Sequence, residues 1–172
     1  GIIGYSYGTI TISITNDADT FFGSDDAAAA FDLNLSDALD TYLDLRNGAD
    51  VTVTMPAGPG SCGNVAQSYT DNSSTVTETV DIDITCLNPG ETVTVNIIAY
   101  VVNNVPAGVT IANTATITGT SLPGAGTPDG VPGNDTGSST PGASGTNTGE
   151  RNDDDGIGGI TDDYIATDTV NH

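Results

Sequence analysis

The chain has almost no positive charge. Its 172 residues include twenty Asp and three Glu but only two basic side chains, Arg46 and Arg151, and no lysine, so the formal net charge is -21. A nucleic-acid partner requires a basic patch that displaces counterions from the phosphates, and this composition excludes one. The sequence therefore predicts cations, rather than polyanions, as partners.

Histidine and tryptophan are also scarce. The single histidine is His172 at the chain end, whereas acid–base or nucleophilic catalysis usually depends on a positioned His or Lys. Paired carboxylates can hydrolyse glycosidic bonds, but such enzymes use an aromatic-lined cleft, and this chain has no Trp and only three Phe. We therefore expect that the protein is not an enzyme.

Long apolar runs are missing as well. No stretch approaches the ~20 apolar residues of a membrane-spanning helix, and no basic segment followed by an apolar one marks a signal peptide. We expect no membrane insertion, and a chain that is either a processed form or an excised segment. The length suits one domain, residues 1–172, with a single core.

Only two cysteines are present, Cys62 and Cys86, and no nearby histidine or further cysteine completes a metal site. The pattern predicts a disulfide, with a pair of unlinked thiols as the alternative. A disulfide indicates an extracellular location. Three N-glycosylation sequons, which begin at Asn34, Asn72 and Asn134, agree with that location.

Alternation of apolar and polar residues recurs along most of the chain and predicts β-strands. Asn88-Pro89-Gly90 predicts a tight turn between two of them. Short strands with turns between them are typical of an immunoglobulin-like β-sandwich, so the predicted fold class is all-β with about seven strands. The predicted strands lie near residues 8–15, 31–35, 76–86, 91–102, 109–117 and 164–170, with a further one at 51–55.

One segment has helical character. In residues 36–45, Ser36 suits a helix cap, and Leu39 and Leu43 have helical spacing, so the sequence predicts either a short helix or an irregular crossover between strands. Asp37, Asp40 and Asp44 would then lie on a polar face.

The strand at 91–102 is apolar on both faces, so something is expected to cover its second face: a loop, a neighbouring copy or the other end of the chain. The uncharged N-terminal residues 1–7 are either the start of the first strand or a segment that pairs with the sheet edge of a neighbouring copy. The candidate assembly residues are Ile2, Ile3, Tyr5, Tyr7, Ile98, Tyr100 and Val102.

Acidic residues gather in two segments that suit calcium, a hard cation that takes six to eight oxygen ligands. The first lies in the long Gly/Asp-rich loop at residues 122–161 and just after it, and the second follows the first strand. The alternative is a solvated acidic surface, which adaptation to high salt or a need for solubility also produces. The candidate ligands are Asp153, Asp155, the Ile157 carbonyl, Asp162 and Asp163, together with Asp17, Asp19, Asp25 and Asp26.

Several stretches resemble one family. They are NTATITGTSLPG, which begins at Asn113, GERNDDDGIGG, DDYIATDTV, TISITNDAD and AFDLNLSDAL. Together they resemble the surface-protein repeat called domain of unknown function eleven. The resemblance implies an immunoglobulin-like sandwich from a large extracellular protein of tandem domains. Some relatives and neighbouring surface domains carry Lys–Asn isopeptide bonds, which a chain without lysine cannot form.

These features favour an extracellular structural subunit that assembles with copies of itself, by strand exchange in one version, into a fibre stiffened by Ca²⁺. The alternative is a binding module of an adhesin, in which the long loop contacts a protein or a carbohydrate. The low aromatic content disfavours a carbohydrate ligand.

Overall fold

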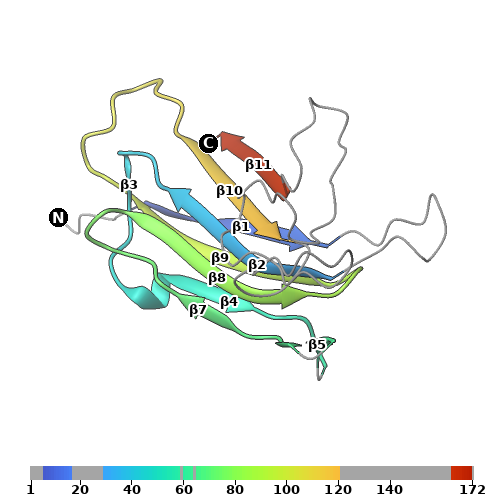
Figure 1. Ribbon diagram of the computed structural model, residues 1–172. Helices are drawn as coiled ribbons and strands as arrows, with labels where there is room; N and C mark the ends of the chain where they lie inside the picture. Colours follow the sequence, from blue (N-terminus) through green and yellow to red (C-terminus); the bar gives the residue numbers. More distant parts are fainter. Residues whose placement is uncertain (1–5, 17–28, 59, 64, 121–163, 172) are drawn as a thin grey trace, which may run out of the picture.

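The computed structural model describes residues 6–16, 29–58, 60–63, 65–120 and 164–171 (Figure 1). In these residues two antiparallel sheets pack face to face, so the predicted all-β sandwich is confirmed. The described part of the chain holds no helix with the length and apolar character needed to span a bilayer.

The four-stranded sheet is built around β9 (Thr92–Val101). Strand β1 (Tyr7–Thr15) pairs with one side of β9 over its whole length. The short strands β3 (Leu43–Asp44) and β4 (Val51–Thr54) pair with the other side, and a 3-10 turn, η1 (Gly48–Asp50), links them. Both sides of β9 are therefore occupied by strands of the same chain.

The second sheet has five strands in the order β11-β10-β2-β8-β7, and a hairpin of β5 and β6 lies beside it. Every pairing in the two sheets is antiparallel. The bounds are β2 (Ala30–Ala38), β5 (Ser61–Cys62), β6 (Val65–Ala66), β7 (Tyr69–Asp71), β8 (Thr79–Leu87), β10 (Ala112–Thr120) and β11 (Tyr164–Asn171).

All seven predicted strands are present, as β1, β2, β4, β8, β9, β10 and β11, but two of them begin later than predicted. Val76 was expected at the start of β8, yet it lies in a turn and is 88% exposed. Glu78 closes that turn with a positive φ of 49°. Val109 likewise precedes β10, which begins at Ala112.

The core lies between the inner faces of the two sheets. Val93, Val95 and Ile97 of β9 are completely buried and belong to one cluster with Val80 and Ile82 of β8. Burying a side chain of this kind stabilises the fold by about 1.5–3 kcal/mol. The alternating pattern that predicted these strands also identified their inner faces correctly.

The prediction of a helix at residues 36–45 is wrong, and the alternative of a crossover is right. Strand β2 continues to Ala38, and the chain then turns into β3. Asp40 directs this turn, because its side chain accepts a hydrogen bond from the Tyr42 amide at 2.9 Å and its carbonyl accepts one from the Leu43 amide at 2.8 Å. The period of two continues through Leu39, which overrides the helical spacing.

The turn predicted at Asn88-Pro89-Gly90 joins β8 to β9, with Gly90 at a φ of 77°. Asn16 fastens it to the end of β1, since its amide donates to the Glu91 carbonyl at 3.1 Å and its carbonyl accepts from the Gly90 amide at 2.6 Å. Partial burial acts to raise the pKa of the Glu91 carboxyl, but hydrogen bonds from Asn88 and Gln67 outweigh it and lower that pKa.

The predicted disulfide between Cys62 and Cys86 is confirmed, with 6.2 Å between the Cα atoms. It ties the β5–β6 hairpin to β8. Both cysteines are buried, and they form a second small cluster with Phe31, against which Ala29 and Val65 pack. The bond closes a loop of 24 residues.

Replacing both cysteines with alanine is expected to lower the free energy of unfolding by about 3 kcal/mol, because the unfolded chain regains the entropy of the open loop. Urea unfolding followed by circular dichroism measures the loss. The wild type in excess reductant serves as the control and should fall to the value of the variant. Equal stability of the variant and the oxidised wild type would contradict this account.

Candidate functional site

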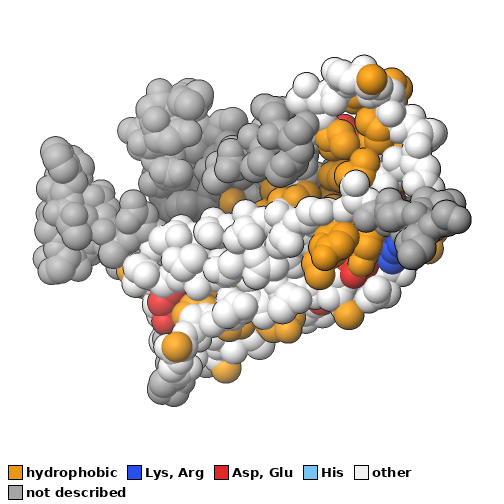
Figure 2. Space-filling view, turned by 180° about the vertical axis from the view of Figure 1, so that it is seen from behind, with side chains coloured by type: hydrophobic (Ala, Val, Ile, Leu, Met, Phe, Trp, Pro, Cys, Tyr) orange, Lys and Arg blue, Asp and Glu red, His pale blue; other side chains and the backbone are white. Residues whose placement is uncertain are grey.

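The outer face of the four-stranded sheet carries no charge along most of its length. Residues directly opposite one another in antiparallel strands share a face, so the β1–β9 and β4–β9 registers define its members. Figure 2 views the molecule from this side, and the broad surface is mostly white. We call it the neutral face: Thr9, Thr11, Ser13 and Thr15 of β1, Thr92, Thr94 and Asn96 of β9, and Thr52 and Thr54 of β4.

Hydrogen bonds link the side chains of the neutral face across strands. The Thr11 hydroxyl donates to the Asn96 side-chain oxygen at 2.8 Å, and the hydroxyls of Thr15 and Thr92 lie 2.9 Å apart. Cross-strand pairs of this kind contribute about 0.2–1 kcal/mol each. The face is thus an ordered array of hydroxyl groups in a chain whose net charge is -21.

At one end of the neutral face lies a cluster of Tyr7, Tyr100 and Arg46. The two tyrosines are partners in the β1–β9 register, and their ring centroids lie 5.7 Å apart. The Arg46 guanidinium lies 4.1 Å from the centroid of the Tyr100 ring. A cation–π contact at an exposed site stabilises by about 0.5–1 kcal/mol. Arg46 is the one arginine in the described residues, and it appears blue in Figure 2.

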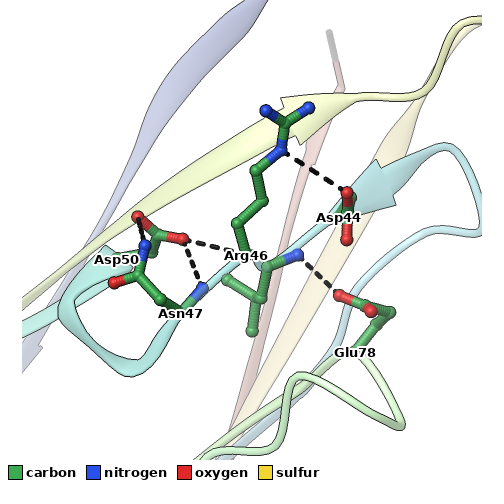
Figure 3. Close-up of polar contacts among 6 residues, drawn as sticks. Asp44, Arg46, Asn47, Asp50 and Glu78 are labelled. Atoms are coloured by element: carbon green, nitrogen blue, oxygen red, sulfur yellow. Dashed lines mark hydrogen bonds and ion pairs between the residues drawn. The ribbon is translucent and has the colours of Figure 1, made fainter.

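Two neighbouring carboxylates contact Arg46 (Figure 3). Asp50 is buried, and its Oδ2 accepts hydrogen bonds from the amides of Arg46 at 2.9 Å and Asn47 at 3.0 Å. Asp44 lies 3.6 Å from the Arg46 Nε. The backbone bonds fix the turn, whereas the half-exposed ion pair adds little.

Glu78 connects this turn to the five-stranded sheet. Its Oε2 accepts a hydrogen bond from the Leu45 amide at 2.6 Å, and its carbonyl accepts one from the Leu39 amide at 2.9 Å. Glu78 immediately precedes β8, so the contact bridges the two sheets at this end of the sandwich.

Glu78→Ala is expected to lower the free energy of unfolding by about 1–3 kcal/mol, since it leaves the Leu45 amide without its acceptor. Glu78→Gln keeps an acceptor oxygen and should recover most of that loss. Chemical denaturation of the three proteins measures the difference. If alanine and glutamine cost the same, the hydrogen bond is not what Glu78 contributes.

An open groove of about 580 Å³ lies beside Arg46. Its lining is mixed polar and apolar, and its basic group is the guanidinium. The residues that line it are Asp44, Leu45, Arg46, Thr75, Val101, Val102 and Asn103.

The structure brings some of the predicted assembly residues together. Tyr7 and Tyr100 are in contact, and Ile98 lies opposite Thr9 on the same outer face. Arg46, which lies in the connection between β3 and η1, covers part of the second face of β9 at Tyr100. Ile2, Ile3 and Tyr5 lie outside the described residues.

The expectation that β9 receives a strand from a neighbouring copy meets a physical obstacle. Within the described residues β1 pairs with one side of β9, and β3 and β4 pair with the other. A strand from another copy could reach β9 only by displacing one of these, with loss of the whole nine-residue β1 register in one case.

The outer face of the five-stranded sheet is acidic instead. Asp81 and Asp83 lie on it, and the Asn34 side-chain amide donates to both, at 2.8 and 2.9 Å. The Asn72 amide donates to Asp83 at 2.8 Å. A glycan on Asn34 would occupy the nitrogen that makes two of these bonds, and a glycan on the exposed Asn72 would occupy the nitrogen that bonds to Asp83. The third sequon, at Asn134, lies outside the described residues.

Asp37 and Asn113 form a buried polar pair that the sequence analysis missed. Asp37 has no exposed surface and Asn113 only 3%, and the Asn113 Nδ2 donates to the Asp37 Oδ2 at 2.6 Å. The Oδ1 atoms of both residues are buried without a partner. The sequence does contain a pattern that places Asp37 in the interior, because Asp37 follows the buried Leu33 and Leu35 at a spacing of two.

Burial raises the pKa of the Asp37 carboxyl, although the hydrogen bond from Asn113 opposes the shift. A protonated Asp37 can donate from Oδ1, which the charged form cannot do. The folded state therefore binds this proton more tightly than the unfolded state. The stabilisation of the fold by protonated Asp37 is present in full below the unfolded pKa of 3.8. It is lost as pH rises through the folded pKa.

Asp37→Asn is expected to raise the free energy of unfolding at neutral pH by on the order of 1–3 kcal/mol, because an amide supplies a donor without a charge. The gain over wild type should shrink as pH falls through the raised folded pKa of Asp37, because wild-type Asp37 then becomes protonated. Urea unfolding of both proteins at several pH values measures the difference in their free energies of unfolding. The pH dependence that comes from the other acids is common to both proteins and cancels in this difference. Asn113→Ala, which removes the donor, should destabilise. A gain independent of pH would contradict the assignment.

The predicted calcium ligands Asp17, Asp19, Asp25, Asp26, Asp153, Asp155, Ile157, Asp162 and Asp163 all lie outside the described residues. Within the part of the chain that is described, no three His, Cys, Asp or Glu side chains group in a way that could hold a metal ion.

Comparison of the chain with protein-family models, with curated proteins and with solved structures finds no match. The resemblance to the surface-protein repeat stays a prediction.

Proposed function

We propose that this chain is an extracellular structural subunit, a surface-protein domain of the repeat type that it resembles, which assembles with copies of itself into a fibre stiffened by bound calcium. The disulfide supports an oxidising, extracellular location. The separation of a neutral face from an acidic one supports self-assembly, because strongly charged copies can approach most closely where they carry no acids.

Calcium binding is supported by the positions of the strand ends to which the two Asp-rich segments are attached. Residues 17–28 join the end of β1 to the start of β2, and residues 121–163 join the end of β10 to the start of β11. The registers place these four strand ends at one end of the sandwich. Thr15, at the end of β1, pairs with Thr92, and the turn before Thr92 connects to Leu87. Leu87 pairs with Ala30 at the start of β2. Thr120, at the end of β10, pairs with Phe31, and Tyr164, at the start of β11, pairs with Gly119.

The fold therefore attaches both acidic segments to the same end. Carboxylates brought together at high density repel one another, and a divalent cation relieves that repulsion while it takes them as ligands. Under this proposal the carboxylates of Asp153, Asp155, Asp162 and Asp163, and those of Asp17, Asp19, Asp25 and Asp26, hold Ca²⁺.

Millimolar calcium is expected to raise the melting temperature of the wild type, and Asp153→Asn/Asp155→Asn should abolish most of that rise. Ligand present at 100 times its dissociation constant stabilises by about 2.7 kcal/mol. Asp81→Asn/Asp83→Asn removes the same charge from the acidic face and should keep the calcium response. Differential scanning calorimetry in calcium and in chelator separates the three proteins, and an unchanged wild-type melting temperature would exclude the metal sites.

Electron microscopy of the purified chain in calcium and in chelator tests the fibre itself. Ordered filaments that loosen without calcium are the expected result. Dispersed particles in both conditions would instead favour an adhesin binding module, whose ligand contacts would lie in the long loop or in the groove beside Arg46.

A further inference from the structure

Strand β1 is an edge strand without the usual protection against pairing. Within the described residues it pairs with β9 alone, so its other side faces no strand. Its sequence, YGTITISIT, contains no charged residue and no proline, and its register with β9 runs from Tyr7 to Thr15 without a bulge. Soluble proteins usually protect such edges with charges, proline, bulges or short length.

The other sheet edges in the described residues are protected. Strand β7 has only three residues and ends in Asp71. Strand β4 has four residues, and Pro56 follows soon after it. Strand β11 contains Asp168. Among the edge strands of the two sheets in the described residues, β1 alone combines length with the absence of charge.

The backbone groups on the free side of β1 can be assigned from the register. The Val101 amide donates to the Ser6 carbonyl, and the Asn16 amide donates to the Glu91 carbonyl, so Ser6 and Asn16 belong to hydrogen-bonded pairs with β9. Such pairs alternate with non-bonded ones along an antiparallel ladder. The even-numbered residues of β1 therefore bond to β9, and the N–H and C=O groups of Tyr7, Thr9, Thr11, Ser13 and Thr15 point to the free side.

We propose that β1 pairs antiparallel with β1 of a second copy, about a two-fold axis at Thr11. This inference deepens the proposed self-assembly and rests on it. A register centred on Thr11 places Thr9 opposite Ser13 and Tyr7 opposite Thr15 of the other copy. All of these residues have free backbone groups, so the hydrogen-bonding pattern of the two edges matches.

The self-matching register selects a second copy as the occupant, and charge favours β1 over the other edges for that joint. Each copy carries a net charge of -21, and pairing through β7 or β11 would bring Asp71 or Asp168 into the joint. Pairing β1 with β1 places only Thr, Ser, Ile, Gly and Tyr at the joint, and threonine pairs directly across strands are favourable. The two neutral faces then continue as one surface across an eight-stranded sheet.

The resulting contact is isologous and closes on itself, so it makes a pair of copies rather than a fibre. Growth of a fibre from such pairs needs a second contact, which the proposed calcium segments, attached at the ends of β1 and β10, supply. The two contacts can be separated experimentally, because each responds to a different change in the solution. Salt screens the repulsion between the copies and strengthens the β1 contact, whereas a chelator removes only the calcium contact.

Sedimentation velocity in about 1 M NaCl with chelator, where the Debye length is about 3 Å, isolates the β1 contact. The wild type is expected to form dimers. Ser13→Pro should weaken dimerisation by on the order of 100-fold, because proline removes the outward N–H and blocks the edge while the bonds to β9 remain. Ser13→Ala keeps the N–H and should dimerise like the wild type, which separates the backbone from the side chain.

Amide hydrogen exchange of the wild type gives a readout that does not depend on Ser13→Pro folding. The amides of Thr9, Thr11 and Ser13 should gain protection as protein concentration rises, whereas those of Ile10 and Ile12, bonded to β9, should be protected throughout. A wild type that stays monomeric, or a folded Ser13→Pro that dimerises like the wild type, overturns the β1 pairing. Filaments in calcium in either case would show that the fibre proposal survives without it.

Discussion

The structure depends on the packing of two aliphatic sheet faces against each other. Strand β9 supplies one side with Val93, Val95, Ile97 and Ala99, and β8 and β2 supply the other with residues such as Val80, Ile82 and Leu35. Removing these side chains from water is the main favourable term in folding. Once it fixes the inner faces, the period of two in a strand assigns every other residue to an outer face.

The two outer faces differ in charge, and the proposed self-assembly depends on this difference. One carries an array of hydroxyls from β1, β4 and β9, and the other carries Asp81 and Asp83 with the amides that bond to them. Twelve of the 23 acids belong to the two segments, residues 17–28 and 121–163, that join strands at one end of the sandwich. A strongly acidic chain thus keeps one face and one edge free of charge, where association meets the least electrostatic resistance.

Much of the fold could be predicted because the alternation of side chains is a local property. The strands, their inner faces, the turn at Gly90 and the disulfide all follow from residue types at short spacing. The helix at 36–45 was wrong because Leu39 and Leu43 fit both periods, and only the partners of β2 select the period of two. Asp37 was assigned to a polar surface for the same reason, although its spacing from Leu35 already placed it inside.

The sequence by itself determined the strands, their buried sides and the neutral character of β1, since these depend on residues adjacent along the chain. Only the tertiary structure decided which strands are neighbours. Among the described residues, it gave β9 a partner on each side and left β1 at an edge. It also placed Asn113 against Asp37, 76 positions away, and Arg46 over Tyr100. Such contacts join residues far apart in sequence, and the closure of a compact core, rather than any local preference, selects them.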